Sequence, residues 1–312
     1  MTAVRVPWTN ASFLAYLGGL TILASILALL SVQSDEHGAV GLVLWASLIL
    51  AILACFAFAA RETGHPVTAG LLAASSVGAF VVFAGALFDW FGWLPDTHDD
   101  QVFLNGFHVG LLAVELLTVV AAAVALRLFR FPLLVLVLAV ASWLFVFDLL
   151  SNGGDWAAIL TIVIGLVFLL AAIAVDDGPS RPFAFWLHVA AGLAIGGGLL
   201  WFFHGGDFDW VLIAVAGLLY VALGNRLARS SWVVLGAWGV LQTAAHWADK
   251  WSDVTNTFGL FFLFPFTIEF DSYDEHYSHQ WAGPLIFAVT GLVFIGIALF
   301  LARRSRPPLA EI

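Results

Sequence analysis

The stretch from Asn105 to Thr118, "NGFHVGLLAVELLT", contains two titratable side chains in an otherwise apolar segment. His108 and Glu115 are seven residues apart, which is close to two helical turns. A helix would therefore carry both on one face, about 10 Å apart along its axis. Asn105 and Thr118 fall on the same side. An ionised carboxylate inside a membrane costs a few kcal/mol, so Glu115 must be protonated, paired or in contact with water.

The chemistry that this spacing favours is a proton relay. Imidazole exchanges protons near neutral pH, and an intramembrane carboxyl is a candidate proton carrier. The separation is too long for a direct hydrogen bond, so a water or a side chain such as Gln242 or His246 would have to bridge the two. His188 is the one titratable candidate nearer the opposite membrane surface. The alternative is that Glu115 and His188 only bond neighbouring helices.

A second set of polar side chains recurs in "QTAAHWADKWSD". Gln242, His246, Asp249 and Asp253 follow one another at spacings of four, three and four, which places them on one face of a helix. Lys250 is one helical turn from His246 and can pair with an acid. This face is predicted to lie at the outer end of its helix.

Two further aspartates end apolar segments at a similar depth, in "LFDWFGW" and "FVFDLLS". If the helices bring these groups together, they form a transport or proton-relay site. Its predicted members are Glu115, His108, His246, Gln242, Asp249, Asp89 and Asp148. The alternative is a set of separate caps at the membrane interface.

A metal site is predicted in the segment "DSYDEHYSHQ". His276 and His279, with Asp274 or Glu275, offer the imidazole and carboxylate ligands that transition metals accept. An exposed acidic loop explains the same residues equally well. The sequence identifies no cofactor, and it has no Walker, G-x-S-x-G or H-E-x-x-H motif, so an enzyme is disfavoured.

The elements that would position these residues are membrane helices. The chain is 62% hydrophobic and only 10% charged, whereas soluble domains are about a quarter charged. Apolar runs predict an all-α bundle of about ten transmembrane helices in a single domain, residues 1–312. The predicted spans are Ser12–Val32, Val40–Ala60, Val67–Phe88, Phe103–Leu126, Phe131–Leu150, Trp156–Val175, Phe183–Phe203, Asp209–Val221, Trp232–His246 and Trp281–Leu301. The eighth and ninth look short and need a further turn at their flanks.

The basic residues support this arrangement and orient it. Every arginine falls in an alternate loop or at a terminus on one side, and Lys250 falls on the other. Because basic residues stay cytoplasmic, both termini are predicted to be cytoplasmic in a cell inner membrane. Most of the 21 acidic residues gather on the opposite side, where they form an acidic outer face. The scattered arginines give no nucleic-acid surface.

Two features complete the organisation. "SNGGDWAAILTIVIG" and "FHGGDFDWVLIAVAG" predict tandem helical hairpins in the same orientation, with Gly-Gly turns, an Asp cap and an interfacial Trp. Residues 251–280 form a long external loop, aromatic at Phe258–Phe266 and acidic beyond it. The aromatic part suits burial in the interface, in the outer mouth or against another membrane subunit.

The sequence therefore favours a transporter or channel for protons, cations or a small solute, embedded in a lipid bilayer. Two alternatives stay open. One is a non-catalytic subunit or docking partner of a membrane complex, which would use Phe258–Phe266. The other is a membrane enzyme acting at the outer face.

Overall fold

The computed structural model describes residues 38, 40–94, 108–150, 154–176, 180–203, 205–252 and 282–304. These residues form long helices joined by turns, and the described part contains no strand. The chain divides into two compact units, Met1–Gly198 and Leu199–Ile312, which are described separately below.

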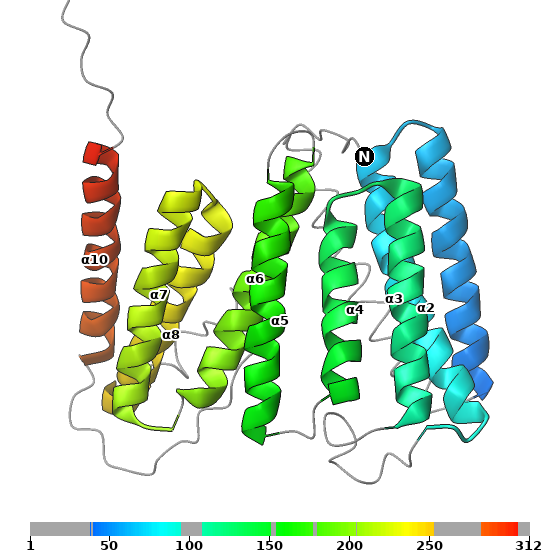
Figure 1. Cartoon of the computed structure of the whole chain (residues 1–312), viewed down its shortest axis with the longest axis horizontal. Coiled ribbons are helices and arrows are strands. Elements are labelled where there is room, and N and C mark those ends of the chain that lie inside the picture. Colours follow the sequence, from blue (N-terminus) through cyan, green and yellow to red (C-terminus); the bar gives the residue numbers. More distant parts are fainter. Residues whose placement is uncertain are drawn as a thin grey trace, which may run out of the picture. The chain divides into compact units, whose positions relative to one another are not determined.

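The first unit is a series of helices that run alternately in opposite directions (Figure 1). Its helices are Val40–Glu62, α2 (Pro66–Trp90), α3 (Val109–Phe129), α4 (Leu133–Leu150), α5 (Gly154–Val175) and most of α6 (Arg181–Phe202). Local chemistry sets their ends. Pro66 begins α2, where its missing N–H costs nothing, and Arg130 ends α3 in the left-handed conformation, with φ 51°.

Arginines mark one end of these helices. Arg61 lies in the last turn of the helix Val40–Glu62. Arg127 lies in the last turn of α3, Arg130 follows that helix, and Arg181 begins α6. We call this the arginine end, and the opposite end, where α3 begins and α4 finishes, the acidic end. The same names apply within the second unit, where Arg226 lies near the end of α7.

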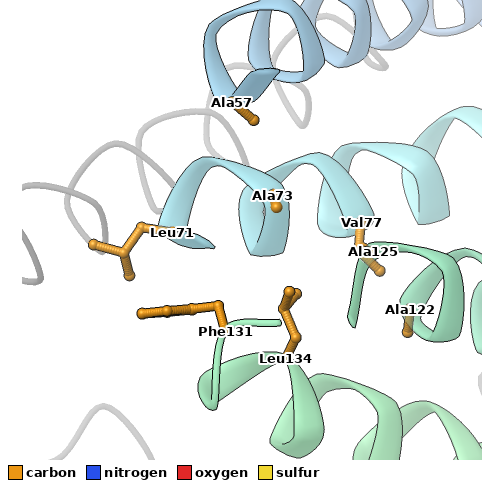
Figure 2. Packing of buried hydrophobic residues seen from close by; sticks show 8 residues of the cluster. All are labelled: Ala57, Leu71, Ala73, Val77, Ala122, Ala125, Phe131 and Leu134. Carbon is orange, nitrogen blue, oxygen red and sulfur yellow. The ribbon is translucent and has the colours of Figure 1, made fainter. Parts of the chain in front are cut away.

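The core of the first unit packs close to the arginine end. Phe131 lies beneath Leu71, and Leu134 points toward Ala73 in Figure 2. A β-carbon built on Gly70 would overlap the Phe131 ring, so glycine is needed there. The cluster comprises Ala57, Leu71, Ala73, Val77, Ala122, Ala125, Phe131 and Leu134. Its small side chains let the helices approach closely, as membrane helices require.

The second unit is built around a hairpin of α7 (Asp207–Leu227) and α8 (Ser230–Ser252), and α10 (Ala282–Arg304) packs against α8. Glycines line the crossing of α7 and α8. A β-carbon at Gly217 would come 2.6 Å from the Gly236 carbonyl oxygen, and one at Gly224 would come 2.7 Å from Val233. The two backbones are therefore in near contact.

The predicted membrane character is confirmed. Seven described helices are long and apolar enough to cross a bilayer: Val40–Glu62, α2, α3, α4, α5, α6 and α7. Large apolar side chains stay exposed along them, including Leu170 at 67% and Leu219 at 64%, as contact with lipid tails requires. The chain is thus a multi-pass membrane protein with an all-helical described structure.

Other parts of the sequence prediction are corrected or stay open. The eighth and ninth spans are indeed longer than their apolar runs, because α7 has 21 residues and α8 has 23. Span one and the loop 253–280 lie outside the described residues, so the count of ten and the placement of the termini stay predictions. The single domain and the tandem repeat also stay predictions.

The two Gly-Gly-Asp turns use their tryptophans differently. Trp156 is 56% exposed, and its indole N–H donates to the Leu150 carbonyl. Trp210 is only 3% exposed, so the two side chains differ in burial, and their predicted interfacial positions stay predictions. The predicted Asp cap is wrong at α7, because Gly206 occupies the cap position and Asp207 binds side chains of α8 instead.

The glycine-lined crossing gives a direct test of the hairpin. Gly217→Ala should destabilise the protein by about 1–3 kcal/mol, because the new methyl group meets the α8 backbone. Gly197→Ala is the matched control, since a β-carbon there has nothing within 4 Å. Thermal unfolding in detergent measures both. Equal stability of the two variants would contradict the described crossing.

Candidate functional site

The first unit buries two acidic side chains at the same depth. Glu115 lies six residues into α3, and Asp148 lies two residues before the end of α4. Because α3 and α4 pack against each other in opposite directions, both positions fall toward the acidic end. Glu115 is 8% exposed and Asp148 is 5% exposed. We call them the carboxyl pair.

The two carboxyl groups lie close enough to interact with each other. An ionised carboxylate has acceptors only, so a hydrogen bond between them requires a proton on one of the two groups. Glu115 Oε2 and Asp148 Oδ1 are buried, and neither has a hydrogen-bond partner among the described residues. A proton shared by the pair would leave these two oxygen atoms open to accept another bond.

No described Lys, Arg or His forms an ion pair with either carboxyl. With one shared proton, the pair carries one negative charge among apolar helices. Burying an unpaired charge is costly, and apolar residues of similar volume are often at least as stable. Stability alone therefore gives a poor account of these two side chains.

The other polar residues of the stretch from Asn105 to Thr118 have different roles. His108 directly precedes α3 and is half-buried, and its carbonyl accepts the first helical hydrogen bond, from the amide of Leu112. It lies between the carboxyl pair and the acidic end, about 10 Å along the axis from Glu115. The Thr118 hydroxyl donates to the Val114 carbonyl of its own helix at 2.8 Å. Asn105 lies outside the described residues.

A second cluster occupies the acidic end of α7 and α8. Lys250 Nζ lies 2.6 Å from Asp207 Oδ2, and His246 Nε2 lies 3.6 Å from Asp207 Oδ1. The His246 ring stacks on Trp210, with centroids 4.5 Å apart and planes at 12°. The Thr243 hydroxyl donates to the Trp210 carbonyl at 2.9 Å. This network joins the start of α7 to the last turns of α8.

The pairing of Lys250 with an acid was predicted from its position and is confirmed. Its partner, Asp207, was not among the predicted site residues, although the repeated Gly-Gly-Asp motif contains it. Gln242 is half-buried on α8, and Asp249 lies on the same helix. Asp207 carries two cationic partners when His246 is protonated, so the cluster functions first as a clamp between α7 and α8.

The described residues therefore bring together only some members of the predicted site. Glu115, Asp148 and His108 belong to the first unit, whereas His246, Gln242 and Asp249 belong to the second, so their convergence stays a prediction. Asp89 lies exposed in the last turn of α2.

The predicted metal ligands, His276, His279, Asp274 and Glu275, lie outside the described residues, as does Phe258–Phe266. Within the described ranges, no group of three or more His, Cys, Asp or Glu side chains could hold a metal ion.

Comparison with known proteins finds no matching family model, no similar curated protein and no similar solved structure. The function must therefore be argued from the geometry of the chain itself.

The contact within the carboxyl pair can be tested by its contribution to the free energy of unfolding. Asp148→Ala should destabilise the protein by about 1–3 kcal/mol, because it leaves the buried Glu115 carboxyl without its partner. Asp148→Asn should cost less, since an amide can still bond. Asp89→Ala, at an exposed position, should change stability by less than about 0.5 kcal/mol. Chemical unfolding in mixed micelles measures the free energy of unfolding of each variant. Equal destabilisation by Asp148→Ala and Asp89→Ala would show that the pair is not formed.

Proposed function

We propose that this chain moves protons across a membrane and that the carboxyl pair is the site that binds and releases them. The single observation that carries the proposal is the close approach of Glu115 and Asp148, two side chains more than nine-tenths buried on neighbouring membrane helices. Ionisable residues inside membrane helices are rare, and they mark ion pathways and proton relays.

The chemistry of the pair suits reversible proton binding. With one proton the pair has a charge of −1, with two it is neutral, and with none it carries −2 at close range. Two adjacent carboxylates in an apolar site strongly disfavour full ionisation, so the pair cycles between one and two protons. The second proton would bind at Glu115 Oε2 or Asp148 Oδ1, the oxygens without a described partner.

The position of the pair supplies a route to one surface. His108 lies at the start of α3, between the pair and the acidic end, and it is half-buried rather than enclosed. Imidazole accepts and donates protons near neutral pH, so His108 can pass protons between external water and Glu115. Bridging waters or another side chain must cover the separation of about 10 Å between them. A predominantly acidic outer face would raise the local proton concentration.

The test is proton flux in reconstituted vesicles. Under an imposed pH gradient with a compensating potassium current, the wild type should carry flux. Glu115→Gln should reduce it to the background of empty vesicles, because an amide keeps the shape and hydrogen bonding of the side chain but cannot exchange a proton. Asp148→Asn should have the same effect. Glu62→Gln is the matched control, since it removes an exposed carboxyl of the same unit outside the predicted site, and it should keep wild-type flux.

Two outcomes would overturn the proposal. Wild-type flux in the Glu115→Gln variant would show that the pair only joins helices. Absence of flux in the wild type under every gradient, with the protein folded and inserted, would instead favour a non-transporting subunit of a membrane complex.

A further inference from the structure

A second buried titratable pair lies in the first unit, far along the bundle from the carboxyl pair. His188 is fully buried on α6, with 0% exposure, and its Nε2 lies 3.6 Å from Oδ2 of Asp176. Asp176 directly follows the last residue of α5, at the arginine end, and its side chain is 24% exposed. The pair thus joins a buried imidazole to a carboxylate that reaches water.

The local packing holds His188 in this position. Helices α5 and α6 approach closely through glycine, since a β-carbon at Gly165 would come 2.7 Å from the Ile195 side chain. His188 lies seven residues after the start of α6, about 10 Å from the arginine end. It lies two helical turns from Arg181, which is exposed. Asp176 is the acidic group that the described part of α5 brings to the imidazole.

We propose that His188 and Asp176 form a second proton-binding site, which exchanges protons with water at the arginine end. In one direction, a hydronium ion at the arginine end protonates the Asp176 carboxylate and becomes water. The proton then moves from the carboxyl oxygen to the Nε2 lone pair of neutral His188. The imidazolium formed is stabilised by the carboxylate left beside it, and the reverse transfer returns the proton to water. No covalent bond other than those to the proton forms or breaks.

This inference rests on the proposed proton transport and extends it. The carboxyl pair lies toward the acidic end, and His108 gives it access to that surface only. A transmembrane route also needs a titratable group with access to the other surface, and a buried imidazole beside a partly exposed aspartate has that character. A structural hydrogen bond would not need the carboxylate to be exposed, and it would not make transport depend on pH at the arginine end.

Two measurements test the proposal separately. The first is a ¹⁵N spectrum of ring-labelled histidine in lipid nanodiscs, with the His188 signal assigned from its loss in His188→Gln. In the wild type this ring should gain and lose a proton as the pH is varied. In Asp176→Asn its proton affinity should fall about tenfold, because the ion-pairing carboxylate is gone. Glu62→Gln, which removes an exposed carboxyl at the same end, should leave the titration unchanged.

The second measurement is flux in sided vesicles while the pH at the arginine end is varied. Asp176→Asn should reduce the flux about tenfold and shift its pH dependence, whereas Glu62→Gln should match the wild type. Asp176 is partly exposed, so this variant tests the site even if His188→Gln fails to fold. A His188 ring that keeps one protonation state throughout the titration, or wild-type flux and pH dependence in Asp176→Asn, would overturn the second site. Absence of wild-type flux would overturn the proposed transport, and the titration would still decide whether His188 and Asp176 bind a proton.

Discussion

The proposed function of this molecule depends on a proton shared between two buried carboxyl groups. Without that proton, Glu115 and Asp148 would place two negative charges side by side among apolar helices, with no described cation paired to either. With it, the charge is halved and the two helices are joined by a hydrogen bond. Proton occupancy and helix packing are therefore linked in this region.

The fold places these groups by fixing how α3 and α4 meet. The turn between them is short, because Arg130 takes the left-handed conformation and Phe131 packs directly onto Gly70. This anchor lies at the arginine end and sets the register of the two helices along their whole length. Glu115 and Asp148, near the other end, then face each other. The second unit uses a different device, an ion-paired clamp of Asp207 with Lys250 and His246.

The sequence predicts the helices well because apolar length and charge are local properties. It also identifies both Glu115 and Asp148 as candidates, but on separate segments. Their pairing depends on how two helices are rotated and aligned, and the pattern of a single helix carries no information on that. Asp207 was missed for the same reason, since its partners lie on α8. Trp156 and Trp210 were assigned the same role, yet Trp210 is buried with the His246 ring stacked on it, a contact between two helices that the local motif does not contain. His188 was recognised as titratable, but its partner could be found only from the meeting of α5 and α6.

The most direct test of this account is whether the carboxyl pair holds a proton at neutral pH. Infrared spectroscopy of the reconstituted protein distinguishes a protonated carboxyl from a carboxylate, and ¹³C labelling of Glu or Asp assigns the band. We predict a protonated carboxyl band in the wild type at neutral pH that shifts with these labels and disappears in the Glu115→Gln/Asp148→Asn double variant. A wild type without such a band, or a band that persists unchanged in the double variant, would contradict the shared proton.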